Sequence, residues 1–341
     1  RWIAEINPEL AAECLIRNDR SIEDLSSDTL TLIIDNIKKK IDCAVNKVEK
    51  AAAFRSLGWF SDQRAGVGVI PKKGVPNIAW SEPIINGPFW MGGDGEALNH
   101  WEGIEVDIPY TFYMARYPVT VAQYRCFIED KGYSAKWRDC WSDLGWKWKE
   151  KGNRTEPYLW NNLYWTVPNN PVVGITWHEA YAFADWLNIK LHELQLLPDN
   201  NLTIRLPLES EWEKAARGTD GLLFPWGNEF KPEIANVKME NQNDIGRTSA
   251  CGMFEENRSL YNVYDLSGNI WEWCISECKQ EYSTGETVHV NKDTARSSRG
   301  GSWNHSPLMS RSASRFWYRP SVAASTWGVR VCASIKLDVE K

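Results

Sequence analysis

The chain has 341 residues, 43% of them hydrophobic and 25% charged, which is typical of a globular protein with a substantial core. Its formal net charge of −6 argues against binding of nucleic acid, because surfaces that bind nucleic acid are usually basic. No apolar stretch approaches the roughly 20 residues that span a bilayer, so we expect no membrane insertion.

Cysteine and tryptophan usage narrows the class of protein. Eight cysteines are scattered along the chain without CxxC pairs, which favours reduced thiols in a cytoplasmic protein over a disulfide framework. The sequence starts at Arg1 without an initiator methionine or a signal peptide, so we interpret it as part of a longer protein. Each of the 20 tryptophan rings can bury on the order of 200 Å², and we expect many of them to wedge a loop-rich fold.

Residues 1–58 have a helical pattern. Residues 1–16 indicate one helix, and residues 27–57 indicate a second helical run that should stop at Gly58. The apolar residues that recur at helical spacing in this run are Leu30, Ile33, Ile34, Ile37, Ile41, Val45 and Val48. We interpret 1–58 as the tail of an upstream helical domain and the turn-rich residues 59–79 as a linker. By analogy with multidomain bacterial proteins, we expect fusion to an upstream signalling or NTPase region.

Residues 80–337 combine short strands with few strong helices. Helices expected over 120–131 and 176–191 each begin with a capping-box pair, Thr120 with Gln123 and Thr176 with Glu179. A shorter helix over 209–217 should end at Gly218. This mixture predicts one large α+β domain.

Seven phrases follow one another in this domain. They are GPFWMG (87–92), PVT (118–120), PVVGITW (171–177), RLPLESEWE (205–213), FPWG (224–227), GNIWEW (268–273) and RGGSW (299–303). Together they resemble the formylglycine-generating-enzyme, or sulfatase-modifying factor, domain. The resemblance implies a variant of the C-type lectin fold.

The metal ligands that the two known reactions of this family require are not evident in the sequence. The resemblance implies a copper-binding cysteine pair in the C-terminal segment, but residues 315–330 contain no cysteine and Cys332 lies just beyond them. Iron-dependent sulfoxide synthesis would need histidines from an attached helical domain, and residues 1–58 contain none. The sequence therefore predicts no catalytic residue, no copper or iron, and a protein that is not an enzyme.

An oxygen-rich turn suggests a structural calcium ion. Carboxylates separated by a turn with inward carbonyls are hard ligands that suit calcium. The family resemblance implies ligation by the side chains of Asp265 and Glu272 with the carbonyls of Gly268 and Ile270. A second site would use Asn236 and the carbonyl of Val237, with Asp244 as a candidate partner. The alternative is that Asp265 and Glu272 accept hydrogen bonds in the turn.

The C-terminal segment has a fixed-looking scaffold. It consists of RGGSW at 299–303, Arg311-Ser312-Ala313, Arg315, Pro320 and Gly328 to Val331. This arrangement resembles the variable proteins of diversity-generating retroelements, a branch of the fold that binds ligands through retromutated residues. The positions between the scaffold residues are then candidate ligand-binding residues. They are His305, Ser306, Leu308, Met309, Ser310, Ser314, Phe316, Trp317, Tyr318, Ser321, Val322, Ala323, Ser325, Thr326 and Trp327.

The residue types at these positions fit mutation at adenines. Changing only the adenines of an Asn codon gives Ser, His, Tyr, Phe, Leu, Val, Ala or Thr, and changing those of Lys and Arg codons gives Met and Trp. Phe316-Trp317-Tyr318 beside small residues predicts an exposed aromatic patch, which usually marks an interaction surface. The alternative is that these rings, with Trp327, are core. Ala323 stands where such relatives often carry Arg, which favours an apolar or protein ligand.

From the sequence we therefore expect a non-catalytic domain that presents a diversified surface to a protein or another macromolecule. The first alternative is a metal-dependent oxidoreductase of the formylglycine-generating type. The second is a structural adaptor.

Overall fold

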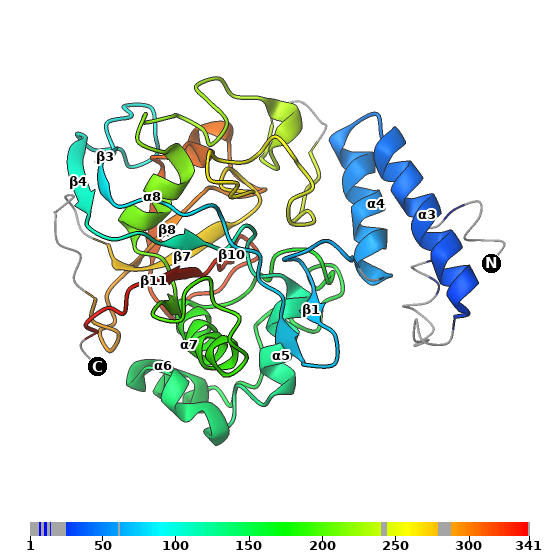
Figure 1. Cartoon of the computed structure of the whole chain (residues 1–341), viewed down its shortest axis with the longest axis horizontal. Coiled ribbons are helices and arrows are strands. Elements are labelled where there is room, and N and C mark those ends of the chain that lie inside the picture. The colour runs from blue at the N-terminus through cyan, green and yellow to red at the C-terminus, as the bar shows by residue number, and fades with distance from the viewer. Residues whose placement is uncertain are drawn as a thin grey trace.

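The computed structural model describes residues 7, 10–11, 14, 25–60, 62–239, 244–278 and 288–339. Most of the helix expected over 1–16 lies outside these residues. Two helices, α3 (Ser27–Cys43) and α4 (Lys47–Trp59), pack side by side at one end of the molecule (Figure 1). The expected single helical run is thus divided, because the Asn46 side chain accepts the backbone N–H groups of Val48 and Glu49 and starts a new helix.

The helical pair contacts the rest of the protein. Ile37 and Phe54 share an apolar cluster with Met253 and Phe254. The segment expected as a linker carries a short hairpin, β1 (Val69–Ile70) with β2 (Val75–Pro76). Its backbone is held by Gln123, whose Nε2 donates to the carbonyls of residues 66 and 77. The division of the chain into domains at residues 59–79 stays a prediction.

In the part of the chain that the structure describes, the strands form four small sheets. The largest has the order β10-β7-β8-β9, in which only the β10–β7 pair is parallel. Its strands are β7 (Trp271–Glu277), β8 (Arg296–Arg299), β9 (Arg315–Tyr318) and β10 (Trp327–Gly328). The second sheet joins β5 (Tyr113–Met114), β11 (Cys332–Ser334) and β6 (Thr203–Arg205), and a separate hairpin pairs β3 (Gly87–Met91) with β4 (Ile104–Ile108).

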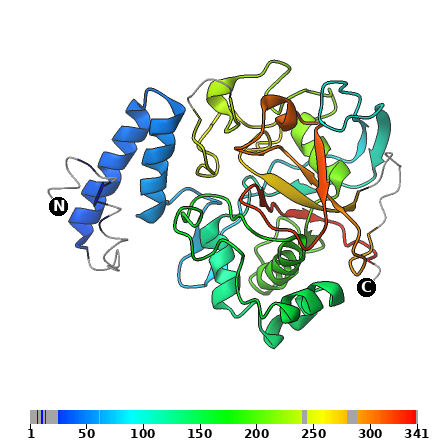
Figure 2. The same cartoon turned by 180° about the vertical axis from the view of Figure 1, so that it is seen from behind.

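Helices cover the largest sheet on both sides. Helix α8 (Glu209–Arg217) lies on one side and α7 (Trp177–Glu193) on the other, as Figures 1 and 2 show from opposite directions. Near α7 lie α5 (Val121–Glu129) and α6 (Asp143–Lys151). Short 3₁₀ helices within the described ranges are η2 (Ala135–Cys140), η3 (Pro232–Ile234) and η4 (Pro307–Ser310).

The predicted helix starts are confirmed. Both capping boxes form, with Thr120 and Gln123 at α5 and Thr176 and Glu179 at α7, and α8 is followed by Gly218 at φ 64°. Tryptophans fill the centre of the α+β domain, as expected: Trp177 and Trp273 are fully buried and donate their indole N–H groups to the carbonyls of Cys274 and Ile175. Among the described residues, no helix is both long and apolar enough to cross a membrane.

Candidate functional site

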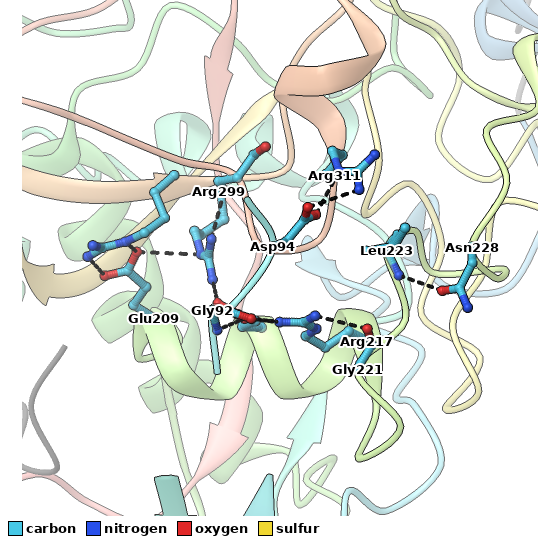
Figure 3. Close-up of polar contacts among 12 residues, drawn as sticks. Gly92, Asp94, Glu209, Arg217, Gly221, Leu223, Asn228, Arg299 and Arg311 are labelled. Carbon is cyan, nitrogen blue, oxygen red and sulfur yellow. Dashed lines mark hydrogen bonds and ion pairs between the residues drawn. The ribbon is translucent and has the colours of Figure 1, made fainter. Parts of the chain in front are cut away.

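The C-terminal segment is fastened to α8 by buried ion pairs. Arg315 donates from Nε and Nη2 to the two carboxylate oxygens of Glu209, at 2.5 and 2.6 Å. Arg299 donates to Glu213, one turn further along the same helix (Figure 3). Burial by itself raises the pKa of Glu209, but the Arg315 and Arg299 charges outweigh it and hold that pKa below the usual value. The glutamates of α8 therefore hold strands β8 and β9 in place through ion pairs with the arginines of these strands.

Two further arginines of the scaffold are also buried and paired. Arg311 contacts the carboxylate of Asp94 from Nε and Nη2, at 2.6 and 2.9 Å (Figure 3). Arg330 donates to both oxygens of Glu272, at 2.7 and 2.9 Å. The scaffold arginines thus point into the protein, and each holds one part of the segment in place.

The residues between these arginines differ in exposure. Some candidate ligand-binding residues are exposed: Ser306, Leu308, Trp317, Tyr318 and Ser321. Others are partly exposed: His305, Met309, Phe316, Val322, Ala323 and Ser325. Four are buried: Ser310, Ser314, Thr326 and Trp327. The structure therefore brings eleven of the fifteen candidates to the surface in whole or in part.

Trp327 was expected to be exposed, and this expectation is wrong. Only 8% of its surface is accessible, its ring stacks on Trp273 with centroids 5.7 Å apart, and its Nε1 donates to Ser298. The parallel pairing of β10 with β7 places it there. Ser314 is likewise internal, because its hydroxyl donates to the carbonyl of Leu308 and accepts the N–H of Leu98.

The three consecutive aromatic residues of β9 do not form one flat patch. Successive side chains of a strand point to opposite faces. Phe316 and Tyr318 both contact the Trp327 ring, with centroids at 5.9 and 5.5 Å. Trp317 shares the other face with Arg315 and has 37% of its surface exposed. The edge strand therefore presents aromatic surface on both of its sides.

His305 follows the scaffold residues 299–303 and is the first of the candidate ligand-binding residues. Its Nδ1 is 2.5 Å from the hydroxyl of Ser302 and accepts the indole N–H of Trp271 at 3.3 Å. Burial, and then the nearby Lys238 charge, lower the pKa of His305, so the ring is neutral near pH 7.

The carboxylates of the expected calcium turn have protein partners. Glu272 accepts from Arg330 and from the Trp212 indole at 2.6 Å, so an arginine already neutralises it. Asp265 accepts the N–H of Gly252, and burial raises its pKa to about 6. The carbonyl of Gly268 accepts the N–H of Ile270. Glu272 does not fit a calcium ligand in this arrangement.

The second expected calcium site is organised by amide hydrogen bonds. The Asn236 amide donates to the carbonyl of Arg247 and to the side chains of Ser249 and Asn269. Val237, next in the chain, is buried, and Asp244 accepts the N–H of Met239. Calcium binding stays a prediction: a melting temperature unchanged by a chelator, with no metal on elemental analysis, would contradict it.

Sequence reasoning missed the residues of α8 that hold the segment. Glu209 and Glu213 alternate with Glu211 in a nine-residue helix whose side chains are all buried. Three glutamates in a short helix, together with an arginine-rich C-terminal stretch, were the feature of the sequence that could have indicated these ion pairs. The partners lie about 86 to 106 residues apart, so spacing alone could not pair them.

Several known proteins are similar in sequence to this chain over most of its length. The hercynine oxygenase of Mycolicibacterium smegmatis is 29% identical over 295 residues, covering 77% of this chain and 64% of the relative. The formylglycine-generating enzyme of Thermomonospora curvata is 28% identical over 308 residues, covering 77% and 97%. An inactive C-alpha-formylglycine-generating enzyme 2 of Bos taurus is 28% identical over 286 residues, covering 74% and 86%. The chain spans less than two thirds of the length of the hercynine oxygenases that it matches.

These names correct one expectation. The sequence predicted a protein that is not an enzyme, because neither the copper-binding cysteines nor the iron-binding histidines are evident in it. That conclusion is contradicted, since the relatives include proteins named hercynine oxygenase and formylglycine-generating enzyme. The absence of these two sets of ligands from the sequence was too weak a basis for excluding an enzyme.

Solved structures agree with the fold. PvdO from Pseudomonas aeruginosa superposes with a TM-score of 0.57 at 20% identity, covering 80% of this chain and all of that one. Treponema denticola variable protein 1 superposes with a TM-score of 0.53 at 19% identity, covering 74% and 94%. The domain is α+β with a C-type-lectin-like fold of the formylglycine-generating-enzyme type. Residues 76–335 match the sulfatase-modifying factor enzyme 1-like domain, and the chain belongs to that family.

Proposed function

We propose that residues 303–327 are the ligand-binding face of this domain and that its exposed positions are diversified to recognise a protein or another macromolecule. The observation that carries the proposal is that the C-terminal segment contains buried residues that hold it in place and exposed residues between them. The scaffold arginines within and beside it, Arg299, Arg311, Arg315 and Arg330, are buried and paired with carboxylates, while Ser306, Leu308, Trp317, Tyr318 and Ser321 face outward.

Such a division supports variation without loss of the fold. Exposed side chains can change with small effects on stability, usually within about 0.5 kcal/mol. The buried pairs keep the backbone of the segment fixed, which lowers the ordering cost of binding. The similarity of fold to a protein named variable protein 1 agrees with this proposal.

A displayed library of the full chain tests the proposal. In one library the five exposed positions are randomised, and in a matched control library the four buried candidates, Ser310, Ser314, Thr326 and Trp327, are randomised. We expect the first library to stay folded and to yield binders to a model protein such as lysozyme, and the second to lose folded members. Equal loss of folding in both libraries would contradict the proposal. A search of neighbouring DNA for a near-copy of the 3′ end that differs at adenines tests the diversification separately.

A second candidate is an oxygen-dependent reaction, favoured by the names of the relatives. The match covers 64% of the length of the Mycolicibacterium smegmatis hercynine oxygenase, so the activity of that whole protein is a proposal for this chain. Oxygen uptake by the full-length protein with iron(II), a thiol and hercynine, or with copper and a cysteine-containing sulfatase peptide, tests this reaction. Uptake no faster than that of metal and substrate alone would count against it.

A further inference from the structure

A loop outside the C-terminal segment exposes large apolar side chains. Residues 157–166, here called the aromatic loop, read PYLWNNLYWT. Tyr158 is 77% exposed, Leu163 56% and Tyr164 45%. Exposed apolar groups that gather in one place usually mark an interaction site. The loop lies outside residues 303–327, to which the proposed function assigns ligand binding.

The aromatic loop is joined to the proposed ligand-binding face. The backbone N–H of Tyr158 donates to the carbonyl of Gly174, whose own N–H donates to the carbonyl of Ala324, at 3.1 and 3.0 Å. Trp165 packs on Trp303 with ring centroids 5.5 Å apart. The loop and the segment are therefore neighbours held by backbone hydrogen bonds and by ring packing.

A third hydrogen bond supports the same junction. Trp303 donates its indole N–H to the carbonyl of Ser325 at 3.0 Å, so the ring that supports Trp165 is itself tied to the segment. Residue 174 needs its glycine, with φ 74°, because a Cβ there would lie 3.0 Å from the Leu159 side chain. The relative position of loop and segment does not depend on the exposed candidate residues.

Basic side chains lie in and beside the two segments. Residues 157–177 contain no Lys, Arg, Asp or Glu, and residues 294–337 contain no Asp or Glu. Arg319 is exposed within the segment, and Lys238 is exposed beside His305, to whose carbonyl its backbone N–H donates. The Arg247 guanidinium lies 3.6 Å from the centroid of the Tyr164 ring. The two segments thus contribute aromatic groups and Arg319, with Lys238 and Arg247 beside them, while Glu156, next to the loop, accepts a hydrogen bond from Asn161.

We propose that the aromatic loop and residues 303–327 form one composite face whose partner is an acidic surface of another protein. The inference rests on the proposed ligand-binding role of residues 303–327. The loop supplies a constant aromatic anchor, and the exposed residues of the segment supply selectivity. Aromatic anchors typically dominate the energy of protein interfaces, while charge complementarity favours partners of opposite sign.

The test uses a displayed library of random 12-residue peptides selected on the immobilised full chain. We expect the enriched peptides to carry net negative charge. Tyr158→Ser should weaken their binding at least tenfold, and Arg319→Glu should weaken it further. Both side chains are exposed, so melting temperatures should match that of the parent chain. Leu260→Ser, a change at a 66% exposed position outside both segments, is the matched control and should leave binding unchanged.

The outcomes separate this inference from the proposed function. Peptides whose binding is lost in Trp317→Ala but is unaffected by Tyr158→Ser would leave the proposed function standing and overturn the composite face. Peptides insensitive to Trp317→Ala, Tyr318→Ala and Tyr158→Ser would contradict both. Enrichment of basic peptides, or tighter binding of single-stranded DNA or anionic vesicles than of acidic peptides, would overturn the acidic protein partner.

Discussion

Arg315 of β9 and Glu209 of α8 form a two-point ion pair that is almost fully enclosed, with side-chain exposures of 2% and 5%. Glu209 also accepts the hydroxyl of Ser297 at 2.8 Å. Three elements, α8, β8 and β9, therefore meet at one carboxylate. The edge strand that displays Trp317 and Tyr318 depends on it for its position.

Glu209→Ala should destabilise the protein by about 3–5 kcal/mol, because it leaves the Arg315 charge buried without its partner. Urea unfolding followed by tryptophan fluorescence measures this. Glu256→Ala is the control: Glu256 is 67% exposed and pairs with Lys231 at the surface, so its loss should cost less than about 1 kcal/mol. Similar effects of the two changes would show that the enclosed pair does not hold the segment.

Trp327→Ala should cost about 3–5 kcal/mol, as expected for removing a large buried ring. Trp317→Ala should cost about 0.5 kcal/mol or less, because that ring is exposed at the sheet edge. Thermal unfolding of the two variants gives the comparison. A large loss of stability in both would place Trp317 in the core and remove it from the proposed face.

The buried Glu179 should make stability depend on pH. Burial raises its pKa to about 6, against 4.5 for an unperturbed glutamate, although Thr176 and Tyr133 donate hydrogen bonds to it. The folded state therefore binds its proton more tightly than the unfolded state. This contribution to stability is complete below pH 4.5, is lost as the pH rises to about 6, and amounts to about 2 kcal/mol.

Glu179→Gln should remove that pH dependence. The free energy of unfolding of the variant minus that of the parent should become more favourable to the variant by about 2 kcal/mol between pH 4.5 and pH 7. Burial also raises the pKa of Asp265 to about 6. Asp265 is present in both proteins, so its contribution to the pH dependence cancels in this difference. A difference that stays constant across this range would contradict the raised pKa of Glu179.

Gly58→Ala should destabilise the junction between α4 and the lectin-like domain. In an exposed helix this change stabilises by about 1 kcal/mol. Here the new Cβ would lie 2.3 Å from the Asn169 side-chain oxygen, and Asn169 cannot swing away without losing its hydrogen bonds to Phe54 and Asp62. Faster proteolysis of the helical pair in the variant, but not in Lys39→Ala, is the expected result. Unchanged proteolysis would mean that the junction tolerates the shift.

Local signals in the sequence determined the elements that need only near neighbours. The capping pairs at Thr120 and Thr176 predicted two helix starts correctly, because a capping box closes within three residues. The ordered motifs between residues 87 and 303 were sufficient for the family and the fold. The scaffold of RGGSW, Arg311 and Arg315 also indicated which side chains would be structural.

The tertiary structure alone decided which residues of the segment reach the surface. Trp327 and Tyr318 have similar apolar character, yet one is buried and the other is 44% exposed. The difference arises because the ring of Trp327, which lies opposite Trp271, stacks on Trp273 from distant β7, whereas Tyr318 is the last residue of β9. Similarly, Glu272 of the expected calcium turn forms an ion pair with Arg330, which lies 58 residues later in the chain. Burial and ion pairing depend on such distant neighbours, and their identity cannot be inferred from local sequence.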